Sequence, residues 1–147
     1  MADLAMVEID PETYIPRLLK YVAVHDVGVA INPQLVRGQI AGGIVHGMGG
    51  ALYEHIDYDD DGQMLSASLV DYLCPTAVEA PLMSIGHLDT PSPFSELGSK
   101  GCGENSAMSA PAAIASAIDD ALAGRKVVVD CLPITPPMLW RIAGEAQ

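Results

Sequence analysis

A glycine-rich helical pattern between residues 32 and 50 most constrains what this chain can fold into. Apolar residues recur there every four positions, and Asn32-Pro33 supplies a helix N-cap followed by a residue favoured at the first helical position. The same segment contains six glycines: Gly38, Gly42, Gly43, Gly47, Gly49 and Gly50. Each costs roughly 0.5–1 kcal/mol relative to alanine, so roughly 3–6 kcal/mol together. We therefore predict a helix whose bare face packs against another backbone or a flat ligand.

The remaining apolar patterns predict strands and further helices. The segment before the glycine-rich helix predicts a β-hairpin that turns at Pro11-Glu12-Thr13. An alanine-rich apolar stripe from Ala110 to Leu122 predicts a second main helix, which Gly124 ends. A short last helix opens at Thr135-Pro136-Pro137 and runs through Trp140. Further strands are expected over residues 52–58, 64–70, 83–88 and 127–131.

Together these elements predict one α+β domain over residues 1–147, with a twisted, mainly antiparallel sheet packed by two main helices. The chain has 147 residues, half of them apolar, which is enough for one buried core. Its 14 glycines and 11 prolines favour tight turns and close backbone contacts over large core side chains. This composition is compatible with a core that a partner completes.

The charge of the chain argues against two classes of partner. Nineteen acidic residues against seven basic ones give a net charge of -12, which repels nucleic acid phosphates and anionic lipid surfaces. No apolar run reaches the roughly 18 residues of a membrane span, and the N-terminal residues lack a signal-peptide layout. We expect a cytoplasmic protein without nucleic acid or membrane partners.

The patterns typical of metal sites are weak. The three cysteines, Cys74, Cys102 and Cys131, lack CxxC spacing, and the four histidines lack HxH or HxxxH spacing. The acidic turn over residues 57–62 matches the first half of a calcium-binding EF-hand loop, but Ser68 stands where that loop has its bidentate glutamate. A calcium or acidic small-molecule binder is thus a minor alternative.

The loop Gly98-Ser99-Lys100-Gly101-Cys102-Gly103-Glu104, placed just before the alanine-rich helix, carries the clearest chemical signal. Its glycines expose backbone N–H groups near a helix N-terminus, which favours an anionic or polar cofactor. The spacing is neither a Walker P-loop nor GxGxxG. Glu104 is compatible with two roles. Partial desolvation would make it a general base, whereas exposure would leave a carboxylate that the helix dipole favours.

The segment GSKGCGENSAMSAPAAIASAIDDAL closely resembles the GxKGxGE-to-helix segment near the C-terminus of the molybdopterin-binding large subunit in the xanthine dehydrogenase and aerobic carbon monoxide dehydrogenase family. Three further segments resemble that subunit in the same order: YVAVHDVGVAINPQLVRGQIAGGIVHGMGGALYEH, DYLCPTA and LPITP. The resemblance covers nearly the whole chain. It implies the C-terminal portion of the molybdopterin-binding domain.

The resemblance also implies roles for individual residues. Glu104 matches the catalytic base that lies beside the molybdenum and deprotonates its water or hydroxide ligand. Gln39, next to Gly38, matches a glutamine that contacts the pterin. The loop whose backbone lies against the cofactor matches Lys100, Gly101, Cys102 and Gly103. Cys102 occupies a position where small aliphatic residues are common, so we interpret it as a packing residue and expect no protein ligand to the metal.

The activity implied by the family is that of a molybdenum hydroxylase, which includes aldehyde oxidases. Such an enzyme oxidises a C–H bond or carbon monoxide with water as the oxygen donor. Its cofactor is molybdenum–molybdopterin, in a dinucleotide form, and electrons leave through iron–sulfur clusters and FAD on partner subunits. The expected partners are these two subunits, the rest of the large subunit and a small-molecule substrate, so we expect a hetero-oligomer.

Two departures leave alternatives open. The large subunit of the family is several times longer, so the chain is either a component of an enzyme or a non-catalytic fragment, assembly or structural module that retains the fold. The hairpin also lacks the glycine usual after Pro-Glu-Thr and has Tyr14 there.

Overall fold

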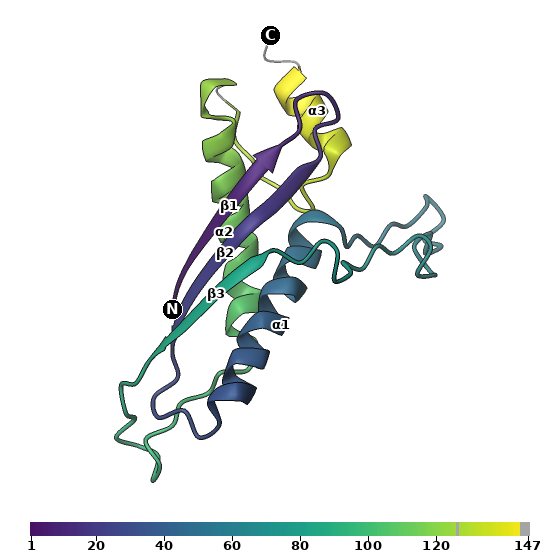
Figure 1. Cartoon of the computed structure of the whole chain (residues 1–147). Helices are drawn as coiled ribbons and strands as arrows, with labels where there is room; N and C mark the ends of the chain where they lie inside the picture. The colour runs from purple at the N-terminus through teal and green to yellow at the C-terminus, as the bar shows by residue number, and fades with distance from the viewer. Residues whose placement is uncertain (126, 145–147) are drawn as a thin grey trace.

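The computed structural model describes residues 1–125 and 127–144. Within these residues, three strands, three α-helices and one 3-10 turn follow each other (Figure 1). Their bounds are β1 Ala2–Ile9, β2 Pro16–Asp26, α1 Pro33–Leu52, β3 Leu82–Leu88, α2 Asn105–Ala121, η1 Ala123–Arg125 and α3 Pro136–Gly144. No helix in this described part of the chain is long and apolar enough to cross a membrane. The cytoplasmic location stays a prediction.

The sheet has the order β1-β2-β3 and is mixed. Strands β1 and β2 pair antiparallel from Ala2↔Val24 to Ile9↔Pro16, as the predicted hairpin requires. Strand β3 pairs parallel to β2, from Lys20↔Leu82 to Asp26↔Leu88. A parallel neighbour needs a long crossover connection, and here the connection contains α1. The predicted α+β class and the predicted strand over residues 83–88 are confirmed.

The turn of the hairpin explains the departure at Tyr14. This residue has a φ of 57°, in the left-handed region that glycine adopts without steric cost. Its backbone N–H donates to the Asp10 carbonyl at 2.8 Å, and the guanidinium of Arg125 lies 5.9 Å from the centre of its ring. These contacts offset a backbone cost of about 1–2 kcal/mol for a residue with a Cβ.

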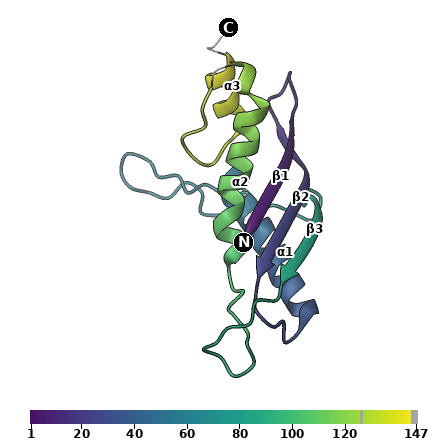
Figure 2. The same cartoon turned by 90° about the vertical axis from the view of Figure 1, so that its left-hand side faces the viewer.

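Both main helices lie on one face of the sheet, in contact with each other (Figure 2). The core between these two layers is mostly aliphatic and includes Leu18, Tyr21, Ala23, Ile40, Ile44, Met48, Ala110, Ile114 and Ile118. Asn32 caps α1 by accepting the Leu35 N–H at 3.1 Å, as predicted. The alanine-rich helix is also confirmed, but it ends at Ala121, and Gly124 lies in the 3-10 turn that follows.

The glycines of α1 let the two helices approach closely. A Cβ added at Gly47 would lie 2.7 Å from the Ala110 Cβ, and one added at Gly43 would lie 2.9 Å from the Ser106 Cβ. Both distances are too short for a real side chain, so the predicted packing against a backbone is confirmed at these two positions. In contrast, apart from the adjoining backbone of the helix itself, no atom of the described chain lies within 4 Å of a Cβ built at Gly38, Gly42 or Gly50.

Three predicted strands are wrong. Leu52 belongs to α1. Residues 53–81 form a long loop that extends away from the sheet and helices, and within it Tyr58 and Met64 form an isolated bridge (Figure 1). Two short segments without a third strand or a helix to pack on cannot form a stable sheet. Residues 127–131 form no strand either, because the Val129 N–H donates to the Asp119 carboxylate at 2.7 Å.

Gly47→Ala is expected to destabilise the fold by about 1–3 kcal/mol, because the new methyl group would overlap Ala110 in a tightly packed interface. The matched control is Gly42→Ala, five residues earlier in the same helix and facing open space. The control should be neutral or stabilising by up to about 1 kcal/mol. Urea unfolding of the three proteins measures both effects, and equal stability of the two variants would contradict the proposed contact.

Candidate functional site

The candidate site lies where the carboxyl ends of β2 and β3 meet the amino ends of α1 and α2, at the lower end of the molecule in Figure 1. Both helix axes therefore present their partly positive ends to this region. The loop over residues 98–104 crosses it and leads directly into α2. A hollow of about 320 Å³ opens beside the loop, and its lining includes Val27, Asn32, Leu35, Ser99 and Lys100.

Gln39 and the glycine-rich loop, predicted as parts of one site, lie in contact. The Gln39 side-chain amide donates to the Gly103 carbonyl at 2.9 Å, across 64 residues of sequence. The surface around this bond is exposed backbone. Apart from the adjoining backbone of each glycine, no described atom lies within 4 Å of a Cβ built at Gly38, Gly101 or Gly103. Exposed backbone with open space above it fits a flat, polar cofactor.

Glu104 occupies the N-cap position of α2, with φ of −103° and ψ of 27°. Within the described residues its carboxylate makes no capping hydrogen bond, although its carbonyl accepts the Met108 N–H at 3.3 Å. The side chain is exposed. This chain alone therefore does not desolvate Glu104, and the carboxylate is held only through its backbone.

Lys100 turns its ammonium group toward the protein. Its Nζ lies 2.6 Å from Oδ2 of Asp26, the last residue of β2. The other oxygen of Asp26 accepts the Gly28 N–H at 3.0 Å and the Thr90 N–H at 3.3 Å. The Lys100 ammonium, with these N–H groups, lowers the pKa of Asp26 to about 2. The side chain of Lys100 thus anchors the loop, while its backbone remains part of the loop surface.

Cys102 packs against the core from the edge of the loop and is partly buried. Burial raises the pKa of its thiol, so the neutral form is favoured. Among the residues that the structure describes, no group of three or more His, Cys, Asp and Glu side chains could hold a metal ion. In the acidic turn, Asp59 instead accepts the N–H groups of Asp61 and Gln63, at 3.0 and 2.8 Å.

The sequence patterns did not reveal the neighbouring residues His25 and Asp26. His25 is fully buried, and its Nε2 lies 3.3 Å from Asp3 Oδ1 and 3.5 Å from Ser106 Oγ, in the first turn of α2. Asp26 holds Lys100, as described above. A polar pair directly after the apolar run of β2, followed by Gly28 with φ of 60°, is the signal that could have indicated both.

Comparison with known proteins assigns the family. The model for the molybdopterin cofactor-binding domain matches residues 1–81, more than half of the chain. This chain belongs to that family. It is 43% identical over 136 residues to the nicotine 6-hydroxylase large subunit of Paenarthrobacter nicotinovorans, covering 92% of this chain and 17% of that protein. It is 32% identical over 144 residues to the carbon monoxide dehydrogenase large chain of Afipia carboxidovorans, covering 98% and 18%.

Solved structures agree with the sequence relatives. The crystal structure of quinoline 2-oxidoreductase from Pseudomonas putida 86 matches with a TM-score of 0.94 and 48% identity, covering 96% of this chain and 18% of that chain. The predicted resemblance to the molybdenum hydroxylase large subunits is therefore confirmed. The chain spans less than a fifth of the length of these relatives.

Replacing Asp26 tests the ion pair with Lys100. Because the folded-state pKa is lowered, the carboxylate stabilises the fold above its ordinary pKa of about 4, and this contribution is lost as pH falls through about 2. Asp26→Asn should therefore lower the urea midpoint at pH 7, and the difference from the wild type should shrink between pH 4 and pH 2. Asp60→Asn, in the exposed acidic turn, is the control and should change neither value.

Proposed function

We propose that this chain is the C-terminal portion of the molybdopterin-binding domain in the large subunit of a molybdenum hydroxylase, and that it forms one wall of the cofactor site. The observation that carries the proposal is the bond between Gln39 and Gly103, which joins the start of α1 to the loop that presents Glu104. Membership of the molybdopterin cofactor-binding family supports the cofactor class.

The residues of the loop fit such a cofactor. The open backbone at Gly101 and Gly103, together with the amino ends of two helices, offers N–H groups to anionic and polar parts of a ligand. We assign cofactor contacts to Gln39, Gly38, Lys100, Gly101, Cys102 and Gly103. When bound, molybdenum–molybdopterin, in a dinucleotide form, supplies a Lewis-acid metal that accepts two electrons.

Glu104 is the proposed catalytic base. Its carboxylate has no capping bond within the described chain, so it is free to accept a proton from the water that supplies the oxygen atom. The exposed carboxylate lies at the amino end of α2, directly after the loop that we assign to the cofactor. The exposed side of Glu104 would be covered by the rest of the large subunit, which would add the desolvation that this chain lacks.

The proposed partners of this chain are inferred from the greater length of its relatives. Because the chain spans 17–18% of the large subunits it matches, the remainder of that subunit must supply the rest of the site. We propose that electrons then pass through an iron–sulfur subunit to an FAD subunit. The relatives are a nicotine hydroxylase and a carbon monoxide dehydrogenase, so the substrate class is a small molecule oxidised at a C–H bond or at carbon monoxide.

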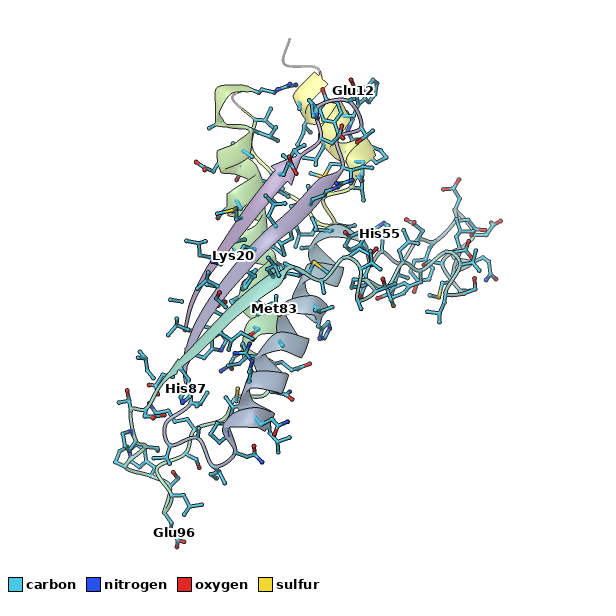
Figure 3. The ribbon with its side chains drawn as sticks, in the orientation of Figure 1. Glu12, Lys20, His55, Met83, His87 and Glu96 are labelled. Carbon is cyan, nitrogen blue, oxygen red and sulfur yellow. The ribbon has the colours of Figure 1, made fainter. Side chains whose placement is uncertain are left out.

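Glu104→Gln should abolish turnover, with a loss of about 10²–10⁴-fold in kcat, because the amide cannot accept the proton. The measurement is steady-state turnover of the purified complex that contains this chain, together with its molybdenum content, which should not change. Glu96→Gln is the matched control, since Glu96 lies at the far tip of the loop before the site (Figure 3). Normal turnover of Glu104→Gln would refute the assignment.

Gln39→Leu should weaken cofactor retention about two- to tenfold, the effect of one lost hydrogen bond, because the loop at Gly103 loses its tie to α1. Gln34→Leu, one and a half turns earlier in the same helix, is the control. The readout is the molybdenum that co-purifies with the complex after dilution. A complex of normal composition that never contains molybdenum would instead favour a non-catalytic structural module.

A further inference from the structure

The loop that carries Glu104 is tied to the protein on both sides of this residue. Before it, the Gly98 carbonyl accepts the N–H groups of Val29 and Ser92, at 3.0 and 2.9 Å, and the Lys100 N–H donates to the Val27 carbonyl at 2.9 Å. These bonds hold the loop against the segment that follows β2. The carboxylate of Glu104 has no such tie within the described residues, so its position depends on its neighbours.

The side chains of the last two residues of β2, His25 and Asp26, make two further contacts with the chain around Glu104. Asp26 binds the Lys100 ammonium at 2.6 Å, four residues before Glu104, and also accepts two backbone N–H groups, one of them from Thr90 after β3. His25 lies 3.5 Å from the Ser106 hydroxyl, two residues after Glu104. Adjacent residues of one strand therefore contact the chain on either side of the proposed base.

Burial and backbone geometry keep this arrangement in place. His25 is fully buried and Ser106 is 1% exposed, so neither side chain has an alternative position in solvent. Gly28 has a φ of 60°, and a Cβ there would overlap the Gly98 carbonyl, so the two segments lie in direct backbone contact. The charged pair is about one-third exposed, which leaves it accessible to substitution without opening the core.

We propose that His25 and Asp26 are positioning residues, which hold the two sides of the loop so that the Glu104 carboxylate faces the reacting water. This inference rests on the proposed function of Glu104. Neither residue touches the reacting atoms in this role. Asp26 acts through Lys100, and His25 acts through Ser106.

The first test is hydrogen exchange of residues 98–104 in the chain, without any cofactor. Asp26→Asn and Lys100→Met should each speed exchange in this loop about two- to fivefold, the size expected for a partly exposed ion pair, with little change elsewhere. Lys100→Arg keeps the charge and should restore slow exchange. Unchanged loop exchange in Asp26→Asn and Lys100→Met would overturn the proposal. For the second contact, Ser106→Ala should speed exchange at the start of α2, and no change there would remove His25 from the pair.

The second test is turnover of the complex that contains this chain. Asp26→Asn should lower kcat about tenfold or more with a smaller change in KM, because a displaced base slows the chemical step more than substrate binding. Asp26→Glu keeps a carboxylate partner for Lys100 and should retain most of the wild-type kcat. Faster loop exchange with normal kcat would overturn the positioning role. Normal turnover of Glu104→Gln would instead refute the proposed function, and the exchange data would still decide whether Asp26 and His25 hold the loop.

Discussion

The close contact between α1 and α2 is the constraint on which the rest of this structure depends. Gly43 and Gly47 leave no space for a Cβ against Ser106 and Ala110, so the two helices meet almost backbone to backbone. This contact places both amino ends at the same end of the sheet, where two partly positive helix ends face one region. Packing between the two helices thereby offsets the low helix propensity of the glycines. The same contact fixes the position of both helix ends, and therefore the geometry of the site.

The site itself is made mostly of backbone. Gln39 reaches the Gly103 carbonyl, the glycines around it are open, and Glu104 is carried by the loop instead of being held by its own side chain. Such a surface can recognise a flat, polar group but offers few side chains that would discriminate between substrates. The chain spans less than a fifth of its relatives. In the function proposed above it contributes the base and one wall of the site, and the remainder of the subunit would choose the substrate.

The helices and the hairpin could be predicted because their apolar residues are the ones buried in the core of this chain. The apolar period of α1 and the alanine stripe of α2 face the core that they form together, and Asn32 caps as its residue type indicates. The patterns over residues 52–58 and 64–70 predicted strands, yet Leu65, Leu69 and Val70 are exposed on the long loop over residues 53–81. Alternating apolar residues show that a segment can be half-buried, but they do not show which surface covers it.

The sequence by itself determined the three α-helices, the β1–β2 hairpin, strand β3 and the family to which the chain belongs. It also predicted which residues approach a cofactor. Tertiary structure decided that β3 lies parallel to β2, that Gln39 bonds Gly103, and that Lys100 turns inward to Asp26. The last two contacts join residues 64 and 74 positions apart. Local propensity acts over a few residues, whereas such distant pairs depend on the path of the crossover and on the packing of two helices, which no short pattern encodes.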